Sequence, residues 1–240
     1  MSRTQLVCHR GANQVAPENT YPASEKAIAL GAAFVEIDVR MSRDGVAYIL
    51  HDETVDRTTD GSGAIADMTS AELDALDAGS WFSPEFAGQR LPKFEEWLVW
   101  LKGKCNAYIE VKEAPVPLIR ELVLKHGWGR EDTYFLSGDN AIRAEMVRLM
   151  PEFRHMEPVR WSKGVADVAR DGFAIIEFEL HEMTPENLAA ARANNLQIQI
   201  FHPDDDADAF RRIIEADVEY ANVDHPATFK RVQAELQPAS

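Results

Sequence analysis

Charged side chains interrupt two short apolar runs in a pattern that suggests a metal site. Glu36 and Asp38 lie two residues apart in one run, and Glu110 and Lys112 lie two residues apart in another. Side chains at positions i and i+2 of a β-strand point to the same face, so each pair projects together from a segment that looks buried. Burying carboxylates is costly unless a cation compensates them. Because oxygen ligands suit Mg²⁺ or Ca²⁺ better than zinc, we expect Glu36, Asp38 and Glu110 to hold one such divalent cation.

Two histidines stand in similar places, each at the end of an apolar run. His9 is followed by Arg10, and His51 is followed by an aspartate. A metal, Arg10 and Lys112 could hold the non-bridging oxygens of a phosphodiester and the charge that develops in the transition state. One imidazole could then take a proton from the attacking group while the other gives one to the leaving alkoxide. A salt-bridge network is the alternative interpretation, but three acids against two bases leave excess negative charge, which favours a metal.

Short β-like runs alternate with helical stretches along the chain. The predicted strands are Leu6–His9, Phe34–Val39, Val46–His51, Ala107–Val111, Tyr134–Leu136, Arg154–Glu157, Phe173–Glu179, Leu196–Phe201 and Tyr220–Val223. The predicted helices are Tyr21–Leu30, Phe94–Leu101, Pro117–Lys125, Ala141–Leu149, Val165–Arg170, Pro185–Ala193, Asp206–Glu215 and Pro226–Leu236. Residues 41–45 are too short for a crossover helix and contain an Asp-Gly turn signal, so residues 46–51 are predicted to fold back as a hairpin.

Removing that hairpin strand leaves eight strands joined through helices, which is the pattern of an α/β (β/α)₈ TIM barrel. A doubly wound open sheet is the alternative, but no glycine-rich phosphate loop follows the first strand. In a TIM barrel the carboxyl ends of the strands meet at one face. The histidines, the three acids, Arg10 and Lys112 would therefore gather there.

Residues 53–92 break this alternation and are expected to form an excursion above the barrel. We predict one TIM-barrel domain over residues 1–240, in which residues 41–92 form the hairpin and a small cap-like insertion. Trp81, within the excursion, either packs a lid or contacts the substrate, and an aromatic lid would exclude water. We take Trp81 as a candidate substrate-binding residue.

The overall charge and composition exclude several classes of protein. The formal net charge of −15 argues against binding to nucleic acid or to anionic membranes. No apolar run approaches the roughly 18 residues of a membrane helix, and no secretory signal is visible. Cys8 and Cys105 do not make a disulfide framework. We expect a cytoplasmic protein without a membrane span that acts on a small molecule; its oligomeric state cannot be read from the chain.

The motif set resembles the glycerophosphodiester phosphodiesterase family. The similar segments are His9-Arg10-Gly11-Ala12, Pro17-Glu18-Asn19-Thr20, Glu36-Ile37-Asp38-Val39, His51-Asp52 with Arg57-Thr58-Thr59, and Glu110-Val111-Lys112. The resemblance implies a TIM barrel with a small insertion after the second strand, a divalent metal, and hydrolysis of glycerophosphodiesters to an alcohol and sn-glycerol 3-phosphate. It also implies an acid/base pair at His9 and His51, metal ligands at Glu36, Asp38 and Glu110, and phosphate contacts at Arg10 and Lys112.

The resemblance is strong over residues 7–113 and weak afterwards. Later strands carry Glu177, Glu179 and His202, for which solvated or self-paired side chains are at least as good an interpretation as contact with the substrate. If they face the pocket, the acids would favour a cationic leaving group such as choline or ethanolamine.

Two other functions remain open at this point. A lysophospholipase D or sphingomyelinase-D-like enzyme uses a similar barrel but needs an apolar entry surface, and no exposed apolar loop is visible beyond Trp81-Phe82. A ligand-binding barrel without catalysis would be expected to have lost a histidine or a metal ligand, and all are present here.

Overall fold

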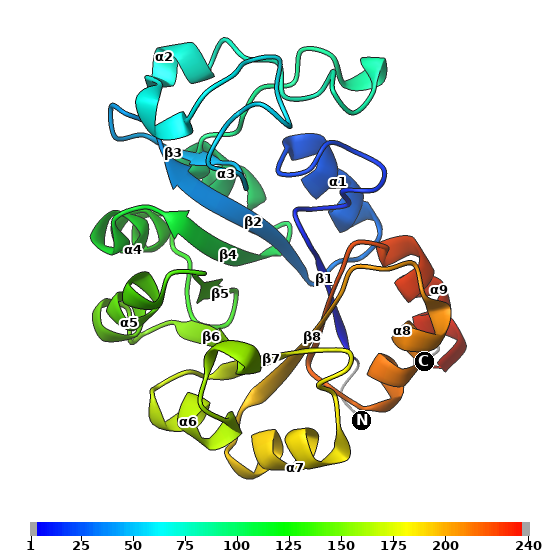
Figure 1. Ribbon diagram of the computed structural model, residues 1–240. Coiled ribbons are helices and arrows are strands. Elements are labelled where there is room, and N and C mark those ends of the chain that lie inside the picture. Colours follow the sequence, from blue (N-terminus) through cyan, green and yellow to red (C-terminus); the bar gives the residue numbers. More distant parts are fainter. Residues whose placement is uncertain (1–3, 237–240) are drawn as a thin grey trace.

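The computed structural model describes residues 4–236 and shows a closed parallel barrel (Figure 1). The strands follow one another in the order β1-β9-β8-β7-β6-β5-β4-β2, and pairing of β1 with β2 closes the ring. Their bounds are β1 Gln5–Cys8, β2 Phe34–Met41, β4 Asn106–Glu113, β5 Thr133–Leu136, β6 Arg154–Pro158, β7 Ile175–Glu179, β8 Gln197–His202 and β9 Tyr220–Val223. The prediction of a (β/α)₈ TIM barrel is confirmed, and the open-sheet alternative was wrong.

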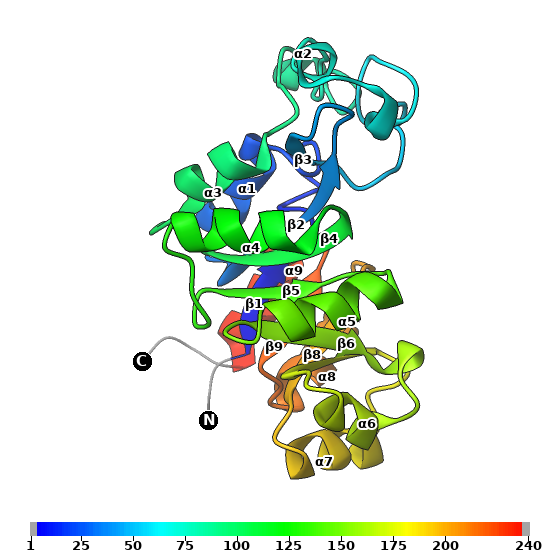
Figure 2. The same ribbon diagram turned by 90° about the vertical axis from the view of Figure 1, so that its left-hand side faces the viewer.

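Helices cover the outside of the barrel (Figure 2). The covering helices are α1 Tyr21–Ala29, α3 Phe94–Leu101, α4 Val116–Lys125, α5 Asn140–Leu149, α6 Val165–Arg170, α7 Pro185–Ala193, α8 Ala207–Glu215 and α9 Pro226–Leu236. The short helix α2 Ser70–Leu73 lies instead in the excursion of residues 53–92 (Figure 2). Their apolar positions recur at helical spacing: α8 buries Ala209, Phe210, Ile213 and Ile214 against the barrel. The predicted helices are confirmed to within a residue or so at their ends, whereas the single turn of α2 was not predicted. Among the helices of residues 4–236, none combines the length and the apolar character needed to cross a bilayer.

A layer of aromatic rings fills the inside of the barrel below its carboxyl end. Tyr134 stacks on Tyr108 with ring centroids 4.5 Å apart, and Phe34 and Tyr220 pack edgewise on each other beside them. Rings of this size leave no channel through the barrel. A site built inside this barrel must therefore lie at the carboxyl ends of the strands.

The hairpin after the second strand forms as predicted. β2 pairs antiparallel with β3 (Ala47–Ile49), with Val39 opposite Ile49, and Gly45 takes a left-handed φ of 83° in the connecting turn. The hairpin and the excursion that follows it share a small hydrophobic cluster, built from Tyr48, Leu50, Val55, Ile65, Leu73, Ala78 and Leu91. The excursion stands beyond β3 at one end of the molecule in both views (Figures 1 and 2).

Candidate active site

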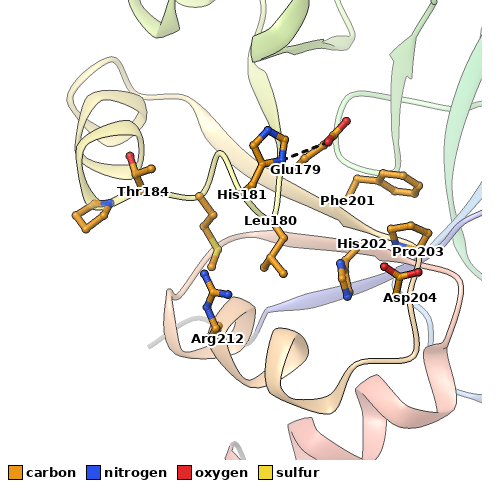
Figure 3. Close-up of a pocket in the computed structure, with 11 residues that line it drawn as sticks. Glu179, Leu180, His181, Thr184, Phe201, His202, Pro203, Asp204 and Arg212 are labelled. Carbon is orange, nitrogen blue, oxygen red and sulfur yellow. Dashed lines mark ion pairs between the residues drawn. The ribbon is translucent and has the colours of Figure 1, made fainter.

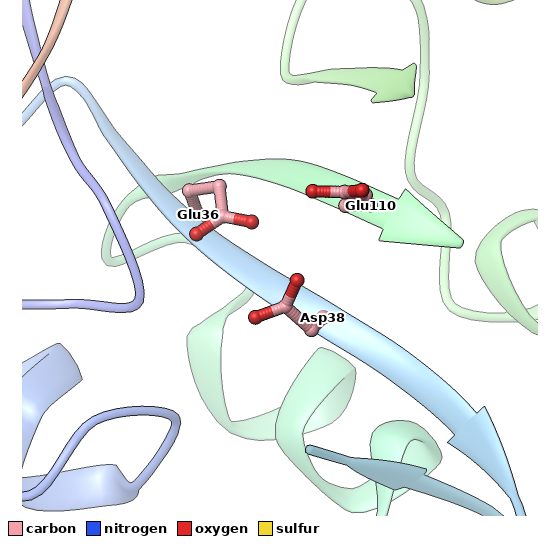
Figure 4. A group of neighbouring side chains, drawn as sticks. All are labelled: Glu36, Asp38 and Glu110. Atoms are coloured by element: carbon pink, nitrogen blue, oxygen red, sulfur yellow. The ribbon is translucent and has the colours of Figure 1, made fainter. Parts of the chain in front are cut away.

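The three predicted metal ligands come together on the inner face of two neighbouring strands (Figure 4). Glu36 and Asp38 lie two residues apart on β2, and Asp38 is opposite Glu110 on β4 in the strand register. One carboxylate oxygen from each of the three lies within 4.8 Å of the others. Strand alternation and pairing alone thus produce the cluster, as the spacing of the residues predicted.

The electrostatics of this cluster fit a bound divalent cation. Burial and the neighbouring Asp38 raise the pKa of Glu36 to about 8. Burial also opposes ionisation of Asp38, but Lys112, His51 and Arg10 together hold the pKa of Asp38 below its usual value. Oε1 of Glu36 is buried without a hydrogen-bond partner among the described residues. An oxygen-rich site with crowded carboxylates and an unpaired oxygen suits a hard cation such as Mg²⁺ or Ca²⁺.

The loop after β1 is held in an unusual backbone conformation. Arg10 has a φ of 55°, and its backbone N–H donates a hydrogen bond of 2.6 Å to Oε2 of Glu36. Gly11 follows with a φ of 80°, and a Cβ there would lie 2.7 Å from the Cβ of Ala23. Only glycine fits this position, because a side chain would meet both a steric and a conformational penalty. The glycine of the His9-Arg10-Gly11 motif therefore allows the loop to adopt the backbone conformation in which the N–H of Arg10 points at the acidic cluster.

His9 is fixed by a carboxylate from the far end of the chain. Its Nδ1 lies 2.7 Å from Oδ1 of Asp224, which follows β9, and Asn13 donates a hydrogen bond to the same oxygen. Burial alone would lower the pKa of His9, but Asp224 and the nearby Glu36 hold this pKa above its usual value. We did not predict this partner from the sequence, although its position directly after the last strand was a usable signal.

His51 has a similar carboxylate partner in its own loop. Its Nδ1 lies 2.7 Å from Oδ1 of Asp52. Arg57 binds that carboxylate through Nε at 2.6 Å and also forms two hydrogen bonds of 2.8 Å with Glu18. Both histidines therefore use Nδ1 to bind a carboxylate, but the carboxylate beside His51 is shared with a guanidinium.

The predicted phosphate-binding cations lie next to the acidic cluster. Arg10 contacts Glu18 at 3.0 Å, and its Nε lies 3.6 Å from Asp38. Nζ of Lys112 lies 2.7 Å from Glu110 and 3.3 Å from Asp38. Burial would lower the pKa of Lys112, but these two acids raise it above its usual value. Both side chains therefore remain cationic at the edge of the site.

Asn19 also belongs to the acidic cluster. With a φ of 59°, it donates through Nδ2 to Asp38 at 2.8 Å and accepts the backbone N–H of Asp38 at 3.3 Å. The neighbouring Thr20 caps α1. Thr20 therefore has a structural role, whereas Asn19 supports an acid of the site.

Trp81 is anchored within the excursion. Its indole N–H donates to the carbonyl of Ala78 at 3.0 Å, and its ring packs edgewise on Phe82. The polar atom of Trp81 is therefore already engaged, and substrate contact through its ring stays a prediction.

A small pocket of about 190 Å³ lies beside the acidic cluster. It is lined by His9, Glu36, Tyr108, Glu110, Lys112, Leu136, Arg160, Trp161, Glu177, Phe201 and Asn222. Arg160 was not predicted as a site residue, because it follows β6 in a short 3₁₀ turn without a recognisable motif. Its NH1 lies 3.5 Å from Oε1 of Glu177, so the lining of the pocket contains a positive and a negative charge side by side.

A larger neighbouring pocket of about 690 Å³ lies between the loops after β7 and β8 (Figure 3). Glu179 and His202 line it, and the ring of Phe201 borders both pockets. Glu179 is paired with His181 at 3.4 Å and with Arg160 at 3.7 Å. Arg160 lies near both Glu177 and Glu179 and offsets their negative charge. This pairing weakens the hypothesis that the two acids would favour a cationic leaving group if they faced the pocket.

Comparison with known proteins agrees with this geometry. A model of the glycerophosphoryl diester phosphodiesterase family matches residues 9–228. A glycerophosphodiester phosphodiesterase of Caldanaerobacter subterraneus subsp. tengcongensis is 31% identical over 236 residues, covering 94% of this chain and 96% of that protein. The crystal structure of a glycerophosphodiester phosphodiesterase from Agrobacterium tumefaciens is 38% identical, with a TM-score of 0.92 over 95% of this chain and 99% of that one.

A more distant structure shares the fold. An Oleispira antarctica phosphodiesterase, solved in complex with its product sn-glycerol-3-phosphate, is 24% identical with a TM-score of 0.87, covering 98% of this chain and 97% of that one. The family match and the full-length relatives argue against the alternative of a ligand-binding barrel without catalysis. This chain belongs to the glycerophosphoryl diester phosphodiesterase family and is an enzyme.

Proposed function

We propose that the protein hydrolyses glycerophosphodiesters to an alcohol and sn-glycerol 3-phosphate by metal-assisted acid/base catalysis. The observation that carries this proposal is the cluster of Glu36, Asp38 and Glu110 with His9 and His51 nearby, each histidine bound to a carboxylate through Nδ1. The three acids would hold one Mg²⁺ or Ca²⁺ ion. When bound, such an ion supplies Lewis-acid stabilisation of the phosphate oxygens.

The side chains of the protein would provide proton transfer, phosphate binding and an apolar surface. With Nδ1 engaged, each imidazole has Nε2 left for proton transfer, so one histidine can accept a proton from the attacking group and the other can protonate the leaving oxygen. Arg10 and Lys112 would contact the phosphate, since both stay cationic beside the cluster. Trp81 would contribute an apolar surface above the site.

The natural substrates would be small soluble diesters of glycerol and a polar head group, which places the protein in glycerol and lipid metabolism. A cytoplasmic location forms part of the proposal, supported by two free cysteines, Cys8 and Cys105.

A panel of head-group diesters tests this function. Release of sn-glycerol 3-phosphate is measured from glycerophosphocholine, glycerophosphoethanolamine and glycerophosphoglycerol, with EDTA and then with added Mg²⁺ or Ca²⁺. We expect chelation to abolish turnover and one of the two ions to restore it. Lysophosphatidylcholine serves as the comparison substrate. Turnover that is unchanged by EDTA would contradict the proposed metal dependence. Faster cleavage of lysophosphatidylcholine than of the glycerophosphodiesters would contradict the proposed substrate class.

A further inference from the structure

The deepest part of the small pocket contains polar groups that the proposed catalysis does not use. Tyr108, Asn222 and Glu177 lie on β4, β9 and β7, and all three line the pocket that also holds His9, Glu36 and Glu110. Tyr108 is two residues before Glu110 on the same face of β4 and lies opposite Glu36 in the strand register, so it lies deeper in the barrel than Glu110 and Asp38. These three side chains form the floor of the pocket.

Tyr108 closes the pocket from below. Its ring belongs to the aromatic layer inside the barrel and stacks on Tyr134, which fixes its position. Its hydroxyl group makes no hydrogen bond with any residue of the described range 4–236. A buried phenol normally finds a partner for its hydroxyl group.

Asn222 is also incompletely satisfied. Its side chain is only 3% exposed, and its amide oxygen is buried without a hydrogen-bond partner among residues 4–236. Leaving a buried polar group unpaired costs free energy, because the group has lost water and gained nothing. A ligand with a hydroxyl group would remove that cost.

Glu177 is held rigidly by one oxygen and leaves the other available. Gln199 donates to Oε2 at 2.8 Å, and the hydroxyl of Tyr134 donates in turn to Gln199 at 2.6 Å. Oε1 makes no hydrogen bond with a described residue, and the guanidinium of Arg160 lies 3.5 Å from it. This chain orients an acceptor oxygen whose charge Arg160 balances.

We propose that Tyr108, Asn222 and Glu177 recognise the terminal hydroxyl group of the glycerol moiety. The inference rests on the proposed function and adds the orientation of the substrate to it. That hydroxyl is the atom of glycerol farthest from phosphorus, so a phosphate at the acidic cluster directs it toward the floor. Its proton is shared between two acceptors, Oδ1 of Asn222 and Oε1 of Glu177, and the phenol of Tyr108 donates to its oxygen.

The orientation has consequences for selectivity. A pocket of about 190 Å³ closed by an aromatic layer has little room beyond glycerol and a phosphate. In a lysolipid this terminal oxygen carries a fatty acyl ester, which is too large for the pocket and has no proton to donate. The orientation therefore excludes lysolipids as substrates. The leaving alcohol instead points outward, past Phe201 toward the larger pocket, where Nε2 of His202 is the one buried side-chain atom of the described lining that lacks a hydrogen-bond partner.

The test compares glycerophosphocholine with 2-hydroxypropyl phosphocholine, in which a methyl group replaces the terminal hydroxymethyl group. Both substrates keep the hydroxyl next to the ester carbon, so attack by that hydroxyl stays possible in each. We expect the protein to prefer glycerophosphocholine by about 100-fold or more in kcat/KM, because buried polar groups are left unpaired by the analogue. Tyr108→Phe and Asn222→Leu should each reduce that preference about tenfold.

A matched control separates this effect from a general change in the barrel. Tyr220→Phe removes a hydroxyl from the same aromatic layer, but that hydroxyl accepts a hydrogen bond from Arg154 at 2.6 Å, away from the pocket. It should keep the wild-type preference. Inhibition by sn-glycerol 3-phosphate and by 2-hydroxypropyl phosphate gives a second measurement on the wild-type protein, which remains decisive if a variant fails to fold.

The outcomes separate the two proposals. No release of sn-glycerol 3-phosphate from glycerophosphocholine would overturn the proposed function. Normal release with equal kcat/KM for the two substrates and equal inhibition by the two phosphates would overturn only this inference. A preference that survives both Tyr108→Phe and Asn222→Leu would remove these residues from it.

Discussion

The two halves of the barrel mouth differ in how their charged groups are connected. In the β1–β4 half, Asp52, Arg57, Glu18, Arg10 and Asp38 form a continuous chain of ion pairs beside the acidic cluster. In the β6–β9 half, Asn222 keeps an unpaired buried oxygen and Arg160 is shared between two acids. Unpaired buried oxygens occur in both halves, because Oε1 of Glu36 and Oδ1 of Asp38 also lack hydrogen-bond partners among residues 4–236. The connected charges suit phosphoryl chemistry, whereas the uncharged amide of Asn222 suits recognition of a substrate hydroxyl.

Backbone conformation also differs between the two halves of the barrel mouth. Arg10 and Asn19 adopt left-handed φ values, at a conformational cost, in the segment that surrounds Glu36 and Asp38. In the second half, positive φ values at residues other than glycine occur at Asn195 and Asp217, both at helix ends away from the pockets. The strained backbone lies where proton and phosphate positions matter most.

Removing one acid of the cluster should produce the largest effect. Glu36→Gln keeps the volume of the side chain but removes a metal ligand, and we expect kcat/KM to fall at least about a thousandfold, since a catalytic metal contributes several kcal/mol. The melting temperature of the metal-free protein should not fall, because the lost charge is one that burial beside Asp38 disfavours. Glu25→Gln, an exposed change on α1, is the control. Retained turnover in Glu36→Gln would show that chemistry is not concentrated in the first half.

Removing either histidine should cost somewhat less. We expect His9→Ala and His51→Ala each to lower kcat by about 10²–10⁴, the usual loss for a general acid or base. His126→Ala provides a matched control, because His126 binds Glu95 on the outside of the barrel. Steady-state kinetics of the three variants measure this, and near-normal turnover would remove that histidine from the mechanism.

Asp224→Asn tests the carboxylate that links His9, directly after β1, to the loop after β9. Loss of a hydrogen bond to a charged partner should lower kcat/KM by about 10–100-fold. Burial then opposes protonation of His9 with less compensation, so the pKa of His9 should fall and its ionisation should move to lower pH. The pH profile of kcat/KM measures this. A shifted acid limb would identify His9 as the base, a shifted alkaline limb as the acid, and no shift would contradict the assigned role of Asp224.

The smallest effect is expected in the larger pocket. Glu179 is 41% exposed at its side chain and already paired with Arg160 and His181, so its charge is screened by water and neighbours. Glu179→Gln should change the ratio of kcat/KM for glycerophosphocholine and glycerophosphoglycerol by less than about threefold. A strong preference for the cationic head group that disappears in Glu179→Gln would restore the hypothesis that these acids select a cationic leaving group.

Local sequence predicted the elements of this fold well and the partners of its site less well. The i and i+2 spacing in Glu36-Ile37-Asp38 defines a common face in any strand, so this pair of acids could be predicted from the strand alone. Glu110 joins the pair only because β4 pairs with β2. The pairing of His9 with Asp224 spans 215 positions and needs β1 to lie beside β9. Arg160 had no motif, because a guanidinium in a 3₁₀ turn gains its role only from the Glu177 and Glu179 that β7 brings near it.

What the sequence determined by itself was the period of each segment, the turn after β2 and the residue types at strand ends, since these depend on near neighbours. Closure of the barrel decided which strand ends face one another. That closure brought Asp224 to His9, placed Tyr108 beside Glu36 and left the amide oxygen of Asn222 without a hydrogen-bond partner among residues 4–236. Such contacts depend on packing and register across the whole ring of strands, and no local pattern carries that information.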